Sequence, residues 1–266
     1  MDEITLFSVI TAVINNEWIS SNRNQIYFDN SIVDPRPINL SKPNEMKNIV
    51  IYGASGHAKM IVDIILKNND YNLIGFIDSY KPVNSAVYGY KIIGNLDSLS
   101  VLIKKFNIEG IVIGIGDNDL RLSIYRSIKK IAPKIEFVPV VHPSAILAED
   151  ILVPEGAVLM AGTIVNANAK LGKFCLLNTK ASLGHDSVMS DFSSLSSGVT
   201  IAGNVTIGFC SSICLSASVS QGITIGDHTV IGGASLVLKS IGDFKLAYGV
   251  PIHTEKDRTV DLMHTA

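Results

Sequence analysis

The chain has 266 residues, a formal net charge of -2 and three cysteines. Its length favours two domains, and its near-neutral charge gives no general attraction to nucleic acid or to an anionic membrane. The odd cysteine number fits a reducing compartment rather than a disulfide framework, no apolar run reaches the ~18 residues of a membrane span, and the acidic N-terminus does not resemble a signal peptide. We therefore expect a cytoplasmic protein with neither nucleic acid nor membrane as a partner.

Residues 1–46 are expected to form an N-terminal extension of unclear role. Apolar residues recur there with the spacing of one helix face, at Ile4, Phe7, Ile10 and Ile14. Prolines between positions 35 and 43 then indicate a linker, because proline removes a backbone donor and fixes φ. Two interpretations remain open: an arm that packs on the next domain or on a partner subunit, and a separate binding element.

Residues 47–141 alternate short apolar runs with helical spacing, which predicts a small α/β domain of Rossmann-like type. Such a domain would contain an open parallel sheet of about four strands, with its ligand at the carboxyl ends of the strands. The expected elements are strands at 48–52, 73–77, 110–115 and 135–141, and helices at 58–67, 96–106 and 119–131.

The first glycine-rich turn, Gly53-Ala54-Ser55-Gly56-His57, joins a strand to the start of a helix. Free N–H groups and the helix dipole favour a phosphate there. Asp78, at the end of the next strand, stands where such folds commonly bind a ribose or a base edge. The turn lacks the G-x-G-x-x-G pattern, so a nicotinamide dinucleotide, and with it a dehydrogenase, is not favoured. The alternative is a tight turn that needs glycine, with His57 as a turn or capping residue.

A second glycine-rich strand end is Gly114-Ile115-Gly116-Asp117-Asn118. Either Asp117 or Asn118 would cap the helix that follows. Arg121 would contact a phosphate, cap the helix or lie on a solvated helix face.

From Leu147 to Val237 every sixth residue is aliphatic, without a slip in register. The residue two places before is mostly small, and the residue after is often glycine, which suits tight corners. A six-residue unit cannot bury its aliphatic side chain alone, but stacked coils do so together, at ~1.5–3 kcal/mol for each large side chain. The period therefore predicts a parallel β-helix built from hexapeptides. It does not specify the handedness.

His185 follows Leu183-Gly184 at an outward-pointing corner, beside Asp186. A histidine takes protons near neutral pH, and a neighbouring carboxylate fixes its tautomer. Gly203 lies one coil later, where its backbone N–H could hold a thioester oxygen. The alternative is a polar corner histidine with no role.

No metal is expected in this protein. The other solenoid histidine, His228, is at a different point of the hexapeptide, and three converging ligands are not visible. Cys175, Cys210 and Cys214 are interpreted as small packing residues.

Together these motifs resemble the bacterial sugar acyltransferases that join a nucleotide-sugar-binding α/β domain to a left-handed β-helix. That group includes the N-acetyltransferases making bacillosamine- and perosamine-type sugars and the sialic-acid O-acetyltransferases. The resemblance covers residues 47–252 and is carried by Ile51-Tyr52-Gly53-Ala54-Ser55-Gly56-His57, Gly75-Phe76-Ile77-Asp78, Gly114-Ile115-Gly116-Asp117-Asn118, His142-Pro143-Ser144-Ala145, Asn178-Thr179, His185-Asp186 and Tyr248-Gly249-Val250-Pro251.

The resemblance implies α/β plus all-β architecture: an α/β domain over 47–141, a left-handed β-helix over 142–252 and a tail over 253–266. It implies His185 as general base, supported by Asp186 and Asn178. The residues implied for the nucleotide sugar are Gly53, Ser55, Gly56, His57, Asp78, Asp117 and Asn118. Acetyl-CoA, as co-substrate, would lie between two subunits of a homotrimer, and its implied contacts are Ser194, Gly203, Gly233, Gly249 and Pro251.

One departure concerns position 194. The family commonly has a second histidine nine residues after the base, where this chain has Ser194. CoA affinity or acyl preference is therefore open.

The expected function is acetyl-CoA-dependent N-acetylation of a nucleotide-linked amino sugar during polysaccharide or glycan precursor synthesis. One alternative is O-acetylation of a sialic acid or a related sugar. An alternative of another class is a non-catalytic trimeric scaffold or sensor.

Overall fold

The computed structural model describes residues 46–259. The expectations for the N-terminal extension fall outside this range, as does half of the tail, residues 260–266. No helix among the described residues is long and apolar enough to cross a membrane.

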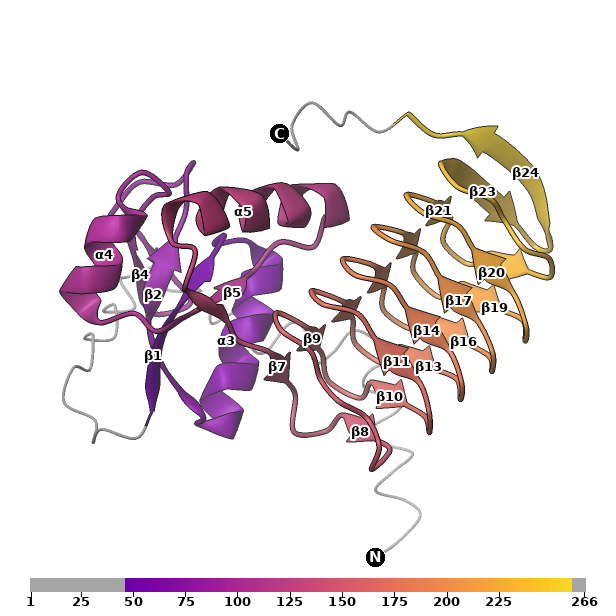
Figure 1. Cartoon of the computed structure of the whole chain (residues 1–266), viewed down its shortest axis with the longest axis horizontal. Coiled ribbons are helices and arrows are strands. Elements are labelled where there is room, and N and C mark those ends of the chain that lie inside the picture. Colours follow the sequence, from indigo (N-terminus) through magenta and orange to yellow (C-terminus); the bar gives the residue numbers. More distant parts are fainter. Residues whose placement is uncertain (1–45, 260–266) are drawn as a thin grey trace, which may run out of the picture. The chain divides into compact units, whose positions relative to one another are not determined.

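The first domain is a six-stranded sheet in the order β3-β4-β2-β1-β5-β6. All neighbours are parallel except β3 and β4, which form an antiparallel hairpin at the edge. This confirms the expected Rossmann-like α/β domain (Figure 1). Its elements are β1 (Lys47–Tyr52), α3 (Gly56–Asn68), β2 (Tyr71–Ile77), β3 (Ala86–Val87), β4 (Tyr90–Gly94), α4 (Leu99–Phe106), β5 (Gly110–Ile113), α5 (Asn118–Ile131) and β6 (Glu136–Phe137).

Two features of this domain differ from the sequence prediction. The β3–β4 hairpin was not predicted, because its turn places Tyr88 and Gly89 at positive φ (50° and 80°), and tyrosine is an uncommon residue in such turns. The strand expected at 135–141 is divided around Pro139. Its first half, β6, pairs with β5, and its second half, β7 (Val140–Val141), pairs with β9 of the solenoid.

The second domain is the expected left-handed parallel β-helix. Two-residue strands stack in parallel with partners 18 residues apart, as in Leu183 against Ile201. The stacks are β22-β19-β16-β13-β10-β8, β11-β14-β17-β20, and β23-β21-β18-β15-β12-β9-β7 with β24 antiparallel to β23. The strands after β7 are β8 (Ile146–Leu147), β9 (Val158–Leu159), β10 (Ile164–Val165), β11 (Lys170–Leu171), β12 (Leu176–Leu177), β13 (Ser182–Leu183), β14 (Val188–Met189), β15 (Ser194–Leu195), β16 (Thr200–Ile201), β17 (Thr206–Ile207), β18 (Ser212–Ile213), β19 (Ser218–Val219), β20 (Thr224–Ile225), β21 (Val230–Ile231), β22 (Leu236–Val237), β23 (Lys245–Gly249) and β24 (Ile252–Asp257).

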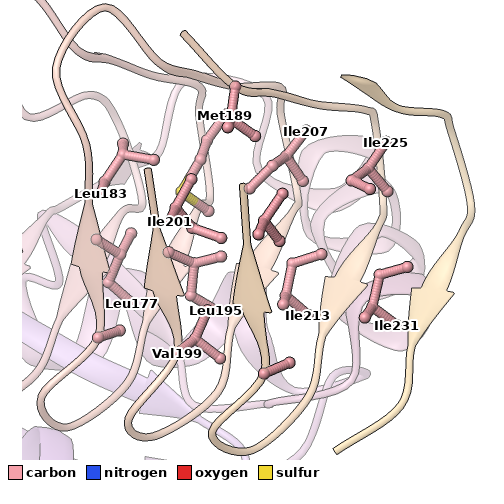
Figure 2. Packing of buried hydrophobic residues seen from close by; sticks show 14 of the residues in the cluster. Leu177, Leu183, Met189, Leu195, Val199, Ile201, Ile207, Ile213, Ile225 and Ile231 are labelled. Carbon is pink, nitrogen blue, oxygen red and sulfur yellow. The ribbon is translucent and has the colours of Figure 1, made fainter. Parts of the chain in front are cut away.

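The aliphatic residues of the hexapeptides form the solenoid core, as predicted. Figure 2 shows their side chains pointing inward from successive coils, and from Leu159 to Val237 nearly all of them are buried. Leu147, Val153 and Leu171, in the first coils, are only partly buried. The core therefore rests on apolar burial repeated coil after coil.

The glycines after the aliphatic residues have a different role from the expected one. The left-handed corner residue stands two places later, as at Asp186 (φ 57°). Gly172, by contrast, is not left-handed, and a Cβ there would lie 2.5 Å from the backbone nitrogen of Asp191 in the next coil. These glycines are needed because adjacent coils approach closely.

Helix α5 joins the two domains. Arg121 donates from Nε to the carbonyl of Phe174 (3.1 Å) and from Nη2 to the carbonyl of Phe192 (3.0 Å), two carbonyls at one corner of successive coils. The ring of Tyr125 packs against the rings of both phenylalanines, which stack on each other at 4.7 Å. The helix thus lies against the solenoid corner that carries these two residues.

Candidate functional site

His185 stands at the corner between β13 and β14, where Asp186 adopts a left-handed backbone conformation. Its Nδ1 lies 2.7 Å from Oδ2 of Asp186. The hydrogen bond from His185, followed by one from Asn168, holds the pKa of the Asp186 carboxyl below its ordinary value. With Nδ1 committed to an anion, Nε2 is the nitrogen left to take a proton. The imidazole is 57% exposed and open to a substrate.

Gly203, one coil later, lies directly against this imidazole. A Cβ at Gly203 would be 2.5 Å from Cε1 of His185 and closer still to Nε2. The structure therefore brings together the two residues that the hexapeptide spacing placed one above the other. Only a residue without a side chain lets the ring occupy this position.

A second layer of contacts, which the sequence analysis did not identify, holds Asp186. Asn168 lies one coil earlier and donates from Nδ2 to Oδ1 of Asp186 (2.5 Å). Its own backbone N–H donates to Oδ2 of Asp150, a further coil earlier (2.6 Å). Polar residues at positions 150, 168 and 186, spaced by 18, are the sequence signal that could have revealed this column.

Asn178 is not near His185 within one chain. It lies at the corner between β12 and β13, at the opposite end of β13 from His185. Its backbone N–H bonds to the carbonyl of Leu195. A joint role for Asn178 and His185 therefore requires a second subunit.

The glycine-rich turn at the start of α3 is fixed by Asp78. Oδ2 of Asp78 accepts the N–H of Ala54 (2.8 Å), and Oδ1 accepts the N–H groups of Tyr80 and Lys81 (2.9 Å each). Burial alone would raise the pKa of Asp78, but these three N–H groups outweigh it and hold the pKa below its ordinary value. Asp78 thus organises the loop, and its contact with a nucleoside remains a prediction.

The loop residues leave the first turn of α3 open to a ligand. Ser55 is the N-cap residue, yet its side chain caps no helix N–H. A Cβ at Gly56 would meet no atom within 4 Å, so the space beside it is free. Burial, and then the charge of Arg121, lower the pKa of His57 to about 4, so His57 is neutral near pH 7. Uncommitted N–H groups at a helix N-terminus retain their attraction for a phosphate.

The second glycine-rich strand end, Gly114 to Asn118, lies at the contact between the α/β domain and the solenoid. Asp117 caps α5 by accepting the N–H of Leu120 (2.8 Å), as expected. Asn118, expected at the substrate site, is 4% exposed and donates from Nδ2 to Ser212 Oγ (2.8 Å) and to the carbonyl of Ser211 (3.0 Å) in the solenoid. Arg121 is neither a phosphate contact nor a solvated residue. Long-range contacts to the solenoid explain both differences.

A cavity of about 370 Å³ lies between α3 and the solenoid corner that carries Asn178. Met160, in its wall, is one coil before Asn178. The sequence did not predict this space because its walls come from four separate segments. The lining includes Lys59, Met60, Asp63, Tyr88, His142 and Met160.

Comparison with known proteins supports the family assignment. The model of the PglD N-terminal domain matches residues 48–128. UDP-N-acetylbacillosamine N-acetyltransferase of Bacillus subtilis (strain 168) is 32% identical over 117 residues, which cover 44% of this chain and 52% of that protein. The match thus spans about half the length of that curated relative.

Among solved structures, a mutant of perosamine N-acetyltransferase from Caulobacter crescentus, in complex with CoA and GDP-perosamine, superposes with a TM-score of 0.74 at 28% identity. The alignment covers 79% of this chain and 96% of that one. The comparisons thus show that this chain is similar to nucleotide-sugar acetyltransferases in sequence and in fold. The acetyltransferase domain of PglB from Neisseria gonorrhoeae shares the fold, with a TM-score of 0.70 at 23% identity over 78% of this chain and 98% of that one.

The CoA contacts that the resemblance implies are dispersed within a single chain. Ser194 is 6% exposed and donates to Ser212 Oγ (3.3 Å) in the seam below α5. Gly233 lies beside Leu215, at the corner between β21 and β22. This is not the corner that carries His185. Gly249 is the last residue of β23, and Pro251 lies in the turn before β24. Of the five, only Gly203 contacts His185, and the roles of the other four remain predictions.

Proposed function

We propose that this protein transfers the acetyl group of acetyl-CoA to the amino group of a nucleotide-linked sugar. The observation that carries the proposal is the His185–Asp186 pair, oriented at an open corner with Gly203 against the imidazole ring. A similar protein of known structure binds CoA and GDP-perosamine, which supports this pair of substrates.

The reaction follows from the proton that Nε2 of His185 can accept. The sugar amine loses a proton to Nε2 as its nitrogen attacks the thioester carbonyl carbon. A C–N bond forms, the C–S bond breaks, and the CoA sulfur leaves with the proton that His185 returns. Such a base contributes ~10²–10⁴-fold in rate. The backbone N–H of Gly203 is our candidate donor to the oxygen that becomes negative during the attack.

The nucleotide is assigned to the α/β domain. Its phosphates would accept hydrogen bonds from the N–H groups at the start of α3, beside Gly56, where the space is free. The cavity between α3 and the corner of Asn178 would then receive the sugar.

The active site is proposed to lie between subunits of a homotrimer. Asn178 and His185 stand at opposite ends of one solenoid face, so neither reaches the other within one chain. A threefold arrangement can place the Asn178 corner of one subunit beside the His185 corner of the next. Closed cyclic symmetry of this kind repeats one heterologous interface around the ring. Because acetyl-CoA is a cytosolic metabolite, we also place the enzyme in the cytoplasm.

A hydroxyl acceptor would use the same base, and O-acetylation is therefore the nearest alternative. The named relatives act on amino sugars, which favours the amine.

The test is thiol release from acetyl-CoA with a panel of UDP-, dTDP-, GDP- and CMP-linked sugars, each as amine and as hydroxyl. We expect turnover on one amino sugar, and a loss of about 10²-fold or more in the His185→Ala variant. Glu149→Ala, at an exposed position of the same corner two coils earlier, is the matched control and should retain the rate. Turnover confined to hydroxyl sugars would establish the alternative. An unchanged rate in His185→Ala would remove His185 as the base.

A further inference from the structure

A second cluster of reactive side chains lies in the seam between the two domains. Asp119 comes from the first turn of α5, and Cys210 and His228 come from the same corner of consecutive coils. Both solenoid residues are left-handed (φ 53° and 50°), so their side chains project outward from the corner toward α5. The carboxylate oxygen, the thiol sulfur and the imidazole nitrogen all lie within 4.8 Å of one another.

Two of these atoms are buried without a hydrogen-bond partner among the described residues. They are Oδ1 of Asp119 and Nδ1 of His228, which face each other at 3.3 Å. His228 is 9% exposed and Cys210 is 1% exposed. A buried polar atom without a partner costs free energy, and most such atoms in proteins have one. The geometry therefore leaves room for a group that binds all three side chains at once.

The surroundings hold each side chain in a fixed orientation. Arg258 donates from Nη2 to Oδ2 of Asp119 (2.9 Å) and from Nη1 to the carbonyl of His228 (2.8 Å), which leaves Oδ1 turned toward the cluster. The His228 ring stacks on Phe244 (5.1 Å, 14°) and meets the edge of Phe209. These contacts resemble the outer-sphere bonds that orient metal ligands in proteins.

We propose that Asp119, Cys210 and His228 bind one divalent transition-metal ion, of which Zn²⁺ fits best. Thiolate, imidazole and carboxylate together are ligands that suit Zn²⁺, whereas Mg²⁺ and Ca²⁺ prefer oxygen alone. Coordination bonds of ~2.0–2.3 Å would draw the three side chains slightly together. A water molecule would take the fourth position from the side of Asp119, whose side chain is 21% exposed.

The charges near the cluster are compatible with a dication. Without an ion, burial and then the Asp119 carboxylate raise the pKa of Cys210 to about 12, so the thiol is protonated. A coordinated metal ion would displace that proton, because thiols bind metals as thiolates. The two ligand anions then balance the ion, and the positive charge of Arg258 is directed to the second oxygen of Asp119.

The ion would link the two domains and take no part in acyl transfer. One ligand belongs to the α/β domain and two belong to the solenoid, at a corner other than that of His185. A ligand that binds only the folded state stabilises it by mass action.

The first test uses the unmodified protein. Metal content after purification, and after addition of Zn²⁺ alone, is measured by elemental mass spectrometry; we expect about one ion per chain. Replacement by Co²⁺ should give a thiolate-to-cobalt charge-transfer band and the visible bands of a tetrahedral site. Chelation should lower the unfolding temperature.

Variants identify the ligands. Cys210→Ser and His228→Ala should lose the ion and the cobalt bands, whereas Cys214→Ser, a cysteine in the same pair of coils that does not face α5, should retain both. Arg258→Ala should weaken the affinity for Zn²⁺ by about 10–100-fold, because it releases the second oxygen of Asp119.

Absence of stoichiometric metal together with absence of a cobalt–thiolate band in the unmodified protein would overturn the proposal. The three side chains would then contact one another directly, with Nδ1 of His228 3.3 Å from Oδ1 of Asp119. Equal metal content in Cys210→Ser and in the unmodified protein would do the same. Neither outcome would affect the proposed acyl transfer.

Discussion

Nδ1 of His185 lies 2.7 Å from Oδ2 of Asp186, and the same carboxylate accepts the side-chain amide of Asn168 through its other oxygen. The histidine is therefore held in one tautomer by a carboxylate that is itself held in place. This arrangement assigns different tasks to three residues of one solenoid corner. In the proposed reaction, His185 takes the proton, Asp186 orients the imidazole, and Asn168 orients the carboxylate.

Asp186→Asn should lower kcat by about 10²-fold or more while the fold is retained. An amide at this position can offer its NH₂ group to Nδ1, which favours the tautomer that carries the proton on Nε2 and so cannot act as base. Steady-state kinetics on the identified amino sugar measure the effect. The circular dichroism spectrum and the subunit number serve as controls, and a variant with the original kcat would show that the carboxylate does not orient His185.

Asn168→Ala should lower kcat with little change in the KM for acetyl-CoA, because Asn168 contacts Asp186 and is not among the residues expected to bind acetyl-CoA. The expected loss is about 10-fold, which corresponds to the low end of the free energy of one hydrogen bond to a charged group, ~1.5 kcal/mol. Asn204→Ala is the matched control, since Asn204 has the same left-handed conformation one coil beyond Asp186. Equal effects of the two substitutions would show that any left-handed asparagine at this corner is needed, and that the bond from Asn168 to Asp186 has no particular role.

The repetitive part of the molecule was predictable because its contacts repeat at fixed spacing. Each aliphatic residue packs on those six and 18 residues away, so the period alone predicts the core. The same spacing places Gly203 above His185. The spacing of 18 residues also relates Asp150, Asn168 and Asp186. Polar residues at a corner can be recognised as neighbours only once the coil length is known.

The domain seam could not be predicted, because its contacts join residues far apart in the sequence. Arg121 bonds to a carbonyl 71 residues away, and Asn118 bonds to a side chain 94 residues away. Nothing local distinguishes these two residues from a polar helix N-terminus that binds a ligand. From the sequence, Cys210 is likewise interpreted as a small packing residue. Its proximity to Asp119 follows only from the position of α5 against the solenoid.

Gly203→Ala should reduce kcat by about 10²-fold, a loss similar to that of the base itself. The added Cβ would lie 2.5 Å from Cε1 of His185, so the imidazole must rotate away from Asp186. Gly116→Ala is the control, because a Cβ there meets no atom within 4 Å. A nuclear magnetic resonance spectrum of the His185 ring would report its displacement directly. Retained activity with an unshifted ring would show that the corner relaxes around the methyl group.

The neutral state of His57 should make stability fall as the pH decreases from about 6.5 to 4. Its pKa is lowered to about 4 in the folded protein, first by burial and then by the charge of Arg121, against an ordinary value of 6.5. The unfolded chain therefore binds a proton in this interval that the folded chain does not. The stabilisation is fully present above about pH 6.5 and is lost as the pH falls through 4, an effect of at most about 3 kcal/mol.

Urea unfolding at pH 7.5, 5.5 and 4.5 would measure this dependence in the unmodified chain and in His57→Gln. Glutamine has no titrating group, so the variant should lose the part of the pH dependence that belongs to position 57. His253→Gln, at an exposed position, is the control and should leave the dependence intact. Parallel curves for the unmodified chain and His57→Gln would mean that the imidazole is as easily protonated in the folded protein as in the unfolded chain. The turn at the start of α3 would then be open enough to solvate a cation beside Arg121.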